Sequence, residues 1–563
     1  MRPTPYKNLK DPPTYWVDYV TGRGMLSNGQ IVQAKVGARR KNPNLTDILD
    51  TAAQHGVERV MFTGKVPLAD AGQRHWLLVQ TPGWKALGHW VAAPVTGRFE
   101  RTATGQRVEI RTAAEWFGAL PLNPAEARDA WDATKFMISE AFDGAPIALS
   151  PTATGTNLWA MSLPRNLDPE PVSRDIAEEL HRTSGQHHLE HLVAGSSHSN
   201  HPDTIALIDP SVTPKIDSFS YVDGRFMYAA LCRELGTGPG QRLRGPETMD
   251  LMRENPYLRA RVLIRFKVPD TWNHVGIFAV QHPNASAGWY YPNRPGAVGE
   301  TWADTAEIHV AQKHGWLVEP IESVVFSQKM PGRDKNKVVA TKPLDTFANR
   351  ITRAREWVTN DEEMPPKIQA AVAAALRAIL LQAIGGFASR GRGRTVVTED
   401  PQSIPPQYLG SVKRQGKLYV YKVPSELHGN QLAYYRPELA VQVWARGRAR
   451  VLEAPTATPG VFGGALHVDP RTLLGINGDA IYTTEIPRWA LPVENGGGDD
   501  GRTGRLRMQG FLEGPLPTPT TLEERDKLRL KSQRAGLDGA INFLDFSIPD
   551  DLADFQISEE QDA

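Results

Sequence analysis

The sequence predicts a multidomain protein of mixed α/β and α+β class. Its 563 residues are too many for one hydrophobic core, so about three or four domains are expected. Short segments with alternating apolar residues follow segments with helical spacing along most of the chain. The clearest helix is the alanine-rich stretch 362–389 (EEMPPKIQAAVAAALRAILLQAIGGFAS), which Gly385 and Gly386 are expected to end.

Residues 1–190 contain signals for both strands and helices. The segment 44–64 (NLTDILDTAAQHGVERVMFTG) predicts a helix with an Asn or Thr cap, followed by a short strand. Further strands are expected in 75–82 (HWLLVQTP) and at the start of 107–118 (RVEIRTAAEWFG), which continues into a helix. The polar stretch from Pro164 to His201 predicts a helix and a linker.

The rest of the chain continues this mixture. A strand and a helical segment are expected in 218–231, a strand in 257–269, and a helix, turn and strand in 304–327. The segment 416–424 (GKLYVYKVP) predicts a hairpin arm, and 437–454 (PELAVQVWARGRARVLEA) fits a helix or a strand. In LLGINGDAIYTTEIP (473–487), Asn-Gly indicates a hairpin turn, because both positions accept positive φ.

Composition limits the compartment and the partners. The 64 basic residues balance the 63 acidic ones, so any surface that attracts nucleic acid must be local. Cys232 is the single cysteine, which excludes an internal disulfide and fits a reducing cytosol. The N-terminus lacks a signal-peptide core, and no run of roughly 18 apolar residues predicts a membrane span. We therefore expect a cytoplasmic monomer that does not enter membranes.

Two acids stand where strands are expected to end. Asp223 follows the strand of 218–231, and Tyr228 lies five residues later; Asp479 lies at the tip of the expected hairpin. Each acid has an ordinary interpretation, since Asp is common as a helix N-cap and in turns. The alternative is that strand ends fix both carboxylates as ligands for a metal ion.

Three segments in order favour the metal hypothesis. DGRFMYA (223–229), RAILLQAIGGFAS (377–389) and NGDAIYTTEIP (477–487) resemble the three polymerase motifs of family B DNA polymerases. The resemblance is strongest to the small protein-primed enzymes of bacteriophages and linear replicons. Asp223 and Tyr228 match the first motif, Arg377 replaces the lysine of the second, and Asp479 matches the second aspartate of the third. VWARG (443–447) is similar to the primer-contacting segment of that subgroup.

The resemblance implies a right-hand polymerase with palm, fingers and thumb, preceded by a ribonuclease-H-like domain of exonuclease type. The domains it implies are listed in chain order: the exonuclease-like domain 1–190, the first part of the palm 191–360, the fingers 361–400, the second part of the palm 401–495, and the thumb with an acidic tail 496–563.

The implied chemistry is nucleotidyl transfer from a dNTP to a primer hydroxyl on a DNA primer-template. Two divalent ions, Mg²⁺ or Mn²⁺, would be held by Asp223 and Asp479. The resemblance implies nucleotide binding by Tyr228, Arg377 and Gly385. It also implies that the primer is either DNA or a terminal protein, in the replication of a phage, plasmid or mobile element.

Several positions depart from the family pattern. Asn477 replaces the first hairpin aspartate, Leu381 and Ile384 replace an Asn and a Tyr, and GRLRMQG (504–510) lies where a Lys-x-Tyr segment is usual. These changes keep two other functions open. One is an inactive polymerase-like protein that binds DNA or serves as a replication scaffold, and the other is an untemplated nucleotidyltransferase.

The N-terminal region lacks the signature that proofreading requires. No Asp-x-Glu occurs in the first 150 residues, where Asp18 stands alone on an expected strand. The two-metal chemistry of a 3′–5′ exonuclease needs several clustered carboxylates. We therefore expect an inactive exonuclease-like domain and a polymerase without proofreading.

Two arginine runs and a histidine-rich stretch each allow two interpretations. The runs SRGRGR (389–394) and RGRAR (446–450) fit either solvated loops or contacts with DNA phosphates. Their predicted DNA-binding residues are Arg390, Arg392, Arg394, Arg446, Arg448 and Arg450. Within 181–201, His187 and His191 have the i, i+4 spacing of a helical Zn²⁺ site, but no cysteine or clear fourth ligand accompanies them, which favours a solvated helix and linker.

Overall fold

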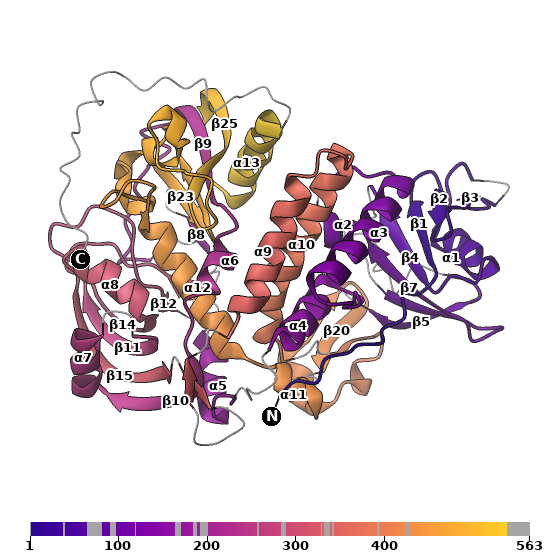
Figure 1. The fold of residues 1–563 in the computed structure, drawn as a ribbon, viewed down its shortest axis with the longest axis horizontal. Coiled ribbons are helices and arrows are strands. Elements are labelled where there is room, and N and C mark those ends of the chain that lie inside the picture. The colour runs from indigo at the N-terminus through magenta and orange to yellow at the C-terminus, as the bar shows by residue number, and fades with distance from the viewer. Residues whose placement is uncertain are drawn as a thin grey trace. The chain divides into compact units, whose positions relative to one another are not determined.

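The computed structural model divides the chain into two compact units, each made of two segments. Unit 1 comprises Met1–Arg165 and Leu344–Arg436, and unit 2 comprises Asn166–Pro343 and Pro437–Ala563. Figure 1 labels the elements of both units. The structure describes residues 2–37, 40–64, 81–89, 97–118, 120–163, 170–183, 189–191, 201–255, 258–282, 289–327, 329–331, 338–340, 343–390, 394–423 and 427–537.

Unit 1 contains a seven-stranded sheet with the order β3-β2-β1-β4-β7-β6-β5. Strands β1, β4 and β7 are parallel neighbours, and the pairs on either side of them are antiparallel. The strands are β1 Thr14–Asp18, β2 Arg23–Leu26, β3 Ile31–Gln33, β4 Arg59–Thr63, β5 Trp84–His89, β6 Gly97–Arg101 and β7 Arg107–Thr112. Most of the strand predicted for 75–82 lies outside the described residues.

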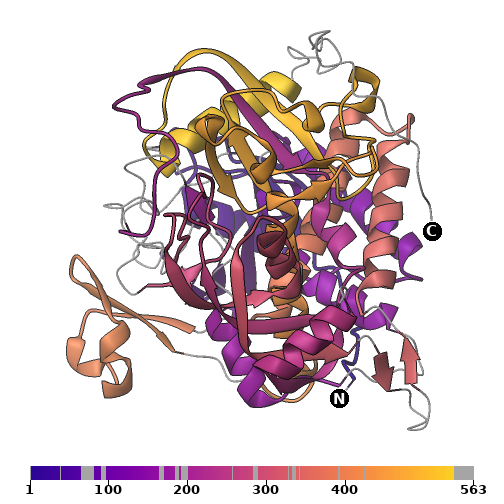
Figure 2. The ribbon, with the colours of Figure 1, turned by 90° about the vertical axis from the view of Figure 1, so that its left-hand side faces the viewer.

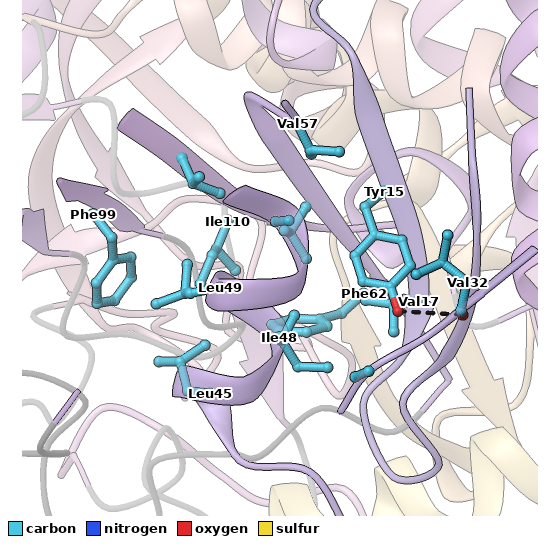
Figure 3. Close-up of a cluster of buried hydrophobic side chains, with 14 of the residues drawn as sticks. Tyr15, Val17, Val32, Leu45, Ile48, Leu49, Val57, Phe62, Phe99 and Ile110 are labelled. Atoms are coloured by element: carbon cyan, nitrogen blue, oxygen red, sulfur yellow. Dashed lines mark hydrogen bonds between the residues drawn. The ribbon is translucent and has the colours of Figure 1, made fainter. Parts of the chain in front are cut away.

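Helix α1 (Leu45–Gln54) packs its apolar side on this sheet. Figure 3 shows Ile48 and Leu49 among the side chains of the sheet, which include Phe62 and Ile110. Asn44 forms a capping box with Asp47, which confirms the predicted helix and its Asn cap. Each fully buried aliphatic side chain contributes about 1.5–3 kcal/mol, so this cluster is the main source of stability for the sheet.

Helices make up most of the remainder of unit 1, and α10 (Pro366–Phe387) lies at their centre. The others are α2 Ala114–Phe117, α3 Pro124–Ala141, α4 Pro151–Ser162, α9 Asp345–Thr359 and α11 Asn430–Tyr434. A small sheet follows α10, with β18 Arg394–Thr398, β20 Leu418–Val423 and β19 Lys413–Gln415 in that order, and with 3-10 turns at Pro401–Ser403 and Pro406–Ser411.

Helix α10 is long and apolar enough to cross a membrane if only length and composition are considered. The sequence prediction concerned an uninterrupted apolar run, and Arg377 and Gln382 interrupt the apolar residues of this helix. Buried residues such as Leu376, Ile379 and Leu380 pack this helix into unit 1, where it contacts α2, α3, α4 and α9. These contacts are those of the core helix of a domain.

The prediction that Gly385 and Gly386 end α10 was wrong by one residue, because the helix continues to Phe387. A Cβ on Gly386 would lie 2.7 Å from Thr152 Cγ2 of α4. A Cβ on Gly155 of α4 would lie 2.4 Å from the Ile379 carbonyl oxygen of α10. Glycine at these two positions lets the backbones of α4 and α10 approach closely.

Unit 2 contains an antiparallel five-stranded sheet with the order β25-β9-β24-β23-β8. Its strands are β8 Leu189–His191, β9 Lys215–Gly224, β23 Leu473–Asn477, β24 Ala480–Thr483 and β25 Leu506–Pro517. Figures 1 and 2 show helix α13 (Leu522–Leu537), in yellow, lying on β25. Phe219, Tyr221 and Tyr482 form part of the buried cluster of this sheet.

The histidine-rich stretch is only partly helical. Helix α5 (Arg174–Thr183) confirms the predicted helix, but β8 is a strand that pairs with β23. His191 therefore does not continue a helix from His187, which lies outside the described residues, and a helical i, i+4 pair is excluded at His191.

A second sheet of unit 2 has the order β10-β15-β11-β14. It comprises β10 Thr237–Arg244, β11 Ala260–Lys267, β14 Val298–Asp304 and β15 Leu317–Ser327, with helices α7 Gly245–Glu254 and α8 Thr305–Lys313. The helix, turn and strand predicted for 304–327 are confirmed by α8 and β15. The segment 437–454, which fitted either a helix or a strand, forms helix α12 (Pro437–Leu452).

Short elements complete unit 2. They are α6 Met227–Leu231, the strand pairs β12 Val280–Gln281 with β13 Trp289–Tyr290, β16 Lys329–Pro331 with β17 Val338–Ala340, and β21 Ala454–Pro455 with β22 Phe462–Gly463, and the 3-10 turns Ala465–His467, Pro470–Thr472, Arg488–Ala490 and Val493–Asn495.

The close contact between α4 and α10 leads to a stability prediction. We expect Gly155→Ala to lower the free energy of unfolding of unit 1 by about 1–3 kcal/mol, because the new methyl group meets the backbone of α10. Gly385→Ala is the matched control, since a Cβ there meets nothing within 4 Å and alanine favours the helix by about 1 kcal/mol. Chemical denaturation followed by circular dichroism measures both; equal effects would contradict the packing argument.

Candidate active site

The pairing of β9 with β24 brings the two acids singled out in the sequence to one end of the sheet. Ala480 pairs with Asp223, and the Gly224 backbone N–H donates to the Asp479 carbonyl oxygen at 3.1 Å. A backbone hydrogen bond therefore joins Asp479 to Gly224, the residue that follows Asp223. Asp223 is only 7% exposed, whereas Asp479 is half-buried.

The hairpin has a two-residue loop whose central residues are Gly478 and Asp479. Asn477 is the last residue of β23 and pairs with Ala480. The expectation that Asn477 and Gly478 form the centre of the turn was wrong by one residue. Gly478 has φ +62°, which suits the glycine that two-residue hairpin loops favour. This register places Asp479 in the loop itself.

Asp223 does not cap a helix. The N-cap of α6 is Phe226, in a left-handed conformation with φ 46°, and no side chain caps this helix. Asp223 lies inside β9, so the ordinary interpretation as an N-cap was wrong.

Both acids act electrostatically on one tyrosine. Tyr221 precedes Asp223 by two residues on β9, and its ring stacks on Tyr482 with centroids 5.6 Å apart. Burial raises the pKa of the Tyr221 phenol, and Asp223, Tyr482 and Asp479 raise it further. The two carboxylates therefore both lie near the same buried phenol.

An arginine that the sequence analysis missed lies on the other side of Asp223. Arg507 of β25 is the direct register partner of Asp223, so the two side chains project from the same face of the sheet. It belongs to GRLRMQG, where the family pattern has a different basic segment. Only the strand register identifies it, because nothing in the local sequence distinguishes it from the neighbouring arginines.

An ion pair between the half-buried Arg225 and the buried Asp499 fixes the turn after β9. Arg225 Nη2 lies 2.5 Å from Asp499 Oδ2. The backbone of Arg225 also donates to Arg505 O and accepts from Gly504 N. The chain immediately after Asp223 is thereby held on the segment that leads into β25.

Tyr228 on α6 packs against α12. A Cβ on Gly447 would lie 3.1 Å from Tyr228 Cε1, so glycine at this position makes room for the ring. Tyr228 remains half-buried, five residues after Asp223.

The comparison with solved structures identifies the fold that carries this site. The chain is similar to phage phi29 DNA polymerase in its orthorhombic crystal form, with a TM-score of 0.50 and 12% identity over 89% of this chain and 85% of that chain. The chain has the fold of a DNA polymerase. A binary complex of phi29 DNA polymerase with primer-template DNA matches with a TM-score of 0.49 and 12% identity over the same shares of the two chains. No protein-family model and no curated protein sequence matches.

Within this polymerase fold, the arginines of α12 form ion pairs and hydrogen bonds with other residues of the chain. Arg446 is 5% exposed and lies 3.3 Å from Glu234 and 3.4 Å from Asp304. Arg448 is 4% exposed, donates to the Gly276 carbonyl at 2.9 Å and covers the ring of Tyr291.

Arg450 also pairs with Glu234, at 2.8 Å. The run 446–450 is therefore part of a helix and not of a solvated loop, and its arginines have structural partners. Their contact with DNA stays a prediction, and phosphates could reach Arg446 and Arg448 only if these partners were displaced.

The remaining predicted residues lie in unit 1. Arg377 is half-buried on α10, Gly385 is exposed on the same helix, and Arg390 Nε donates to the Tyr435 hydroxyl at 3.2 Å. Arg394 begins β18, and Arg392 lies outside the described residues. Of the two departures in α10, Leu381 is half-buried and Ile384 is fully buried in the core of unit 1.

Asp18 is the last residue of β1 and holds a turn. Its Oδ1 accepts from the backbone N–H groups of Val20 at 2.8 Å and Thr21 at 3.1 Å. These bonds give this carboxylate a structural role at the start of the connection to β2.

The ion pairs of α12 lead to a prediction of pH-dependent stability. Burial raises the pKa of Glu234, but Arg450 and Arg446 outweigh it and lower the pKa below its ordinary value. A lowered carboxyl pKa stabilises the folded state above the unfolded pKa of about 4.3, and this contribution is lost as the pH falls through the folded pKa. At pH 7, Glu234→Gln should lower the free energy of unfolding by about 1–3 kcal/mol.

The difference in stability between Glu234→Gln and the wild type should narrow as the pH falls from about 4.3 through the lowered folded pKa of Glu234, below which both side chains are neutral. Denaturation curves between pH 3 and 7 measure it, with the exposed Glu254→Gln as the matched control. A Glu234→Gln effect that is constant with pH, or equal to that of the control, would contradict this assignment.

Proposed function

We propose that the protein is a DNA polymerase that transfers nucleotides from dNTPs to a primer hydroxyl and lacks proofreading. The observation that carries the proposal is the strand register that brings Asp223 and Asp479 to one end of a sheet, in a chain with a polymerase fold. In this proposal, the sheet β25-β9-β24-β23-β8 is the floor of the palm.

The donor set at this site suits hard divalent cations. Two carboxylates offer oxygen ligands of the kind that Mg²⁺ and Mn²⁺ prefer. Asp223 and Asp479 would hold the ions, which activate the attacking hydroxyl and neutralise charge on the triphosphate. Hydrogen bonding to β24 and β25 on its two sides keeps β9 rigid, so the Asp223 carboxylate needs little reorganisation.

Other residues of the chain would bind and orient the substrates. Tyr228, set against Gly447, would lie beneath the sugar of the incoming nucleotide and exclude a 2′-hydroxyl by its size. Arg377 would contact the triphosphate through charge-assisted hydrogen bonds, near Gly385 of the same helix. The primer-template would contact Arg390, Arg392 and Arg394 through its phosphates.

The biological setting follows from the motif resemblance. We propose a cytoplasmic monomer that replicates a phage, plasmid or mobile element, with a DNA primer or a terminal protein supplying the hydroxyl. The motifs at Asp223, Arg377 and Asp479 support this setting.

A second candidate function is a polymerase-shaped DNA-binding scaffold without catalysis. The observation that favours it is the register of Arg507 with Asp223, which places a cation beside one of the two acids. If this arginine neutralises Asp223 permanently, metal binding is weakened. If it instead contacts a phosphate of the primer, Asp223 remains available to the ions.

The first functional prediction concerns the two acids. Asp223→Asn and Asp479→Asn should each reduce primer extension by at least about 1000-fold, because a lost carboxylate misplaces a metal ion and about 4 kcal/mol of transition-state stabilisation disappears. Asp217→Asn is the matched control, since Asp217 is an exposed carboxylate on the same strand. Primer extension with Mg²⁺ or Mn²⁺, with and without a template strand, provides the measurement.

Each outcome of this experiment selects one function. Extension that requires the template and both acids supports the polymerase, whereas extension without a template supports an untemplated nucleotidyltransferase. Wild-type protein that binds DNA but does not extend the primer favours the DNA-binding scaffold. Full activity in Asp223→Asn or Asp479→Asn would contradict the proposed site.

The second functional prediction concerns proofreading. The protein should leave a 3′-mismatched primer intact in the absence of dNTPs. The Asp18 carboxylate accepts hydrogen bonds from the backbone of the turn that follows it, and the first 150 residues contain no Asp-x-Glu motif. Gel analysis of a labelled mismatched primer measures this, with a proofreading polymerase as the positive control. Metal-dependent trimming that disappears in Asp18→Asn would show that the N-terminal domain is an active exonuclease.

A further inference from the structure

Two imidazoles of unit 2 converge on a single carboxylate oxygen that belongs to neither Asp223 nor Asp479. His314 Nε2 and His467 Nε2 each lie 3.0 Å from Glu453 Oε2. The three ligand atoms all lie within 4.8 Å of one another. His314 follows α8, Glu453 follows α12, and His467 ends a 3-10 turn, so the cluster joins three segments.

The spacing of these atoms is close to that of a transition-metal site. Zn²⁺ binds histidine nitrogen and carboxylate oxygen at about 2.0–2.2 Å, so neighbouring ligand atoms in a tetrahedral site are about 3.3 Å apart. The observed 3.0 Å separations need to lengthen by only a few tenths of an ångström to admit the ion. Two histidines and one carboxylate leave the fourth position open for water or another ligand.

The surroundings hold the ligands in place. Lys313 Nζ lies 2.7 Å from the other oxygen of Glu453, Oε1, which leaves Oε2 to face the imidazoles. The ring of Phe462 stacks on His467, and Trp489 Nε1 donates to the His467 carbonyl at 3.1 Å. Glu453 is only 7% exposed, so its orientation is set by the protein and not by solvent.

We propose that His314, Glu453 and His467 form a binding site for Zn²⁺ or a similar transition-metal ion, separate from the site proposed for Mg²⁺ or Mn²⁺. Mixed nitrogen and oxygen ligands favour Zn²⁺ over Mg²⁺, which prefers oxygen alone. A bound ion cross-links the ends of α8 and α12 to the segment that leads into β23. The site therefore stabilises the fold of unit 2 and does not depend on polymerase activity.

The test is a titration of the tag-free, chelator-stripped full-length protein with Zn²⁺ in the presence of excess Mg²⁺. Isothermal calorimetry should show one Zn²⁺ per chain, and His314→Gln or His467→Gln should weaken binding by at least about 100-fold, since each removes a direct ligand. His55→Gln is the matched control, because His55 is exposed and lies outside the cluster. His187→Gln/His191→Gln tests the histidine-rich stretch as a rival site.

A spectroscopic measurement on the wild type avoids any dependence on the folding of variants. X-ray absorption at the zinc edge should show nitrogen and oxygen neighbours at about 2.0–2.2 Å, with the scattering pattern of two imidazoles. No Zn²⁺ binding, or binding that is lost only in His187→Gln/His191→Gln, would overturn the proposal and leave the cluster as a hydrogen-bonded network. Loss of Zn²⁺ binding without loss of primer extension would confirm that the two sites are independent.

Discussion

The antiparallel pairing of β9 with β24 is the constraint on which the candidate active site depends. It joins two segments that are far apart in the sequence and bonds Gly224 to the backbone of Asp479. The stacked rings of Tyr221 and Tyr482 lie on the same face and anchor this pairing from the buried side. Because a shift by one residue would turn every side chain to the opposite face, these buried rings also hold the acid in register.

Charged side chains are used in two ways in unit 2. Arg446 and Arg448 of α12 are buried and Arg450 is half-buried, and all three have partners that hold this helix to Glu234 and to its other neighbours. Arg507 is instead half-buried beside Asp223, at the end of the sheet. Breaking a buried pair is costly, whereas a partly exposed cation can exchange partners. Arg507 is therefore better suited to contact a phosphate than Arg446 or Arg448.

Local patterns in the sequence were sufficient for elements whose determinants are local. The capped helix α1, the strand and helix around Asp223 and the hairpin carrying Asp479 followed from periodicity and turn residues. The predicted end of α10 was misplaced by one residue because of a tertiary contact, since α4 packs against Gly386 inside the helix. Arg507 and the His314 cluster were missed because only strand register and helix packing bring their members together. The grouping of 344–436 with the N-terminal segment likewise reflects packing and not chain order.

The central claim is that the carboxylates of Asp223 and Asp479 share the binding of divalent cations. The most direct measurement is a crystal structure with Mn²⁺, primer-template DNA and a non-hydrolysable dNTP, in which anomalous scattering locates the ions. We expect Mn²⁺ peaks at coordination distance, about 2.0–2.3 Å, from oxygens of both side chains. A structure without such peaks, in which Asp223 is ion-paired with Arg507 in the presence of the substrates, would contradict the account.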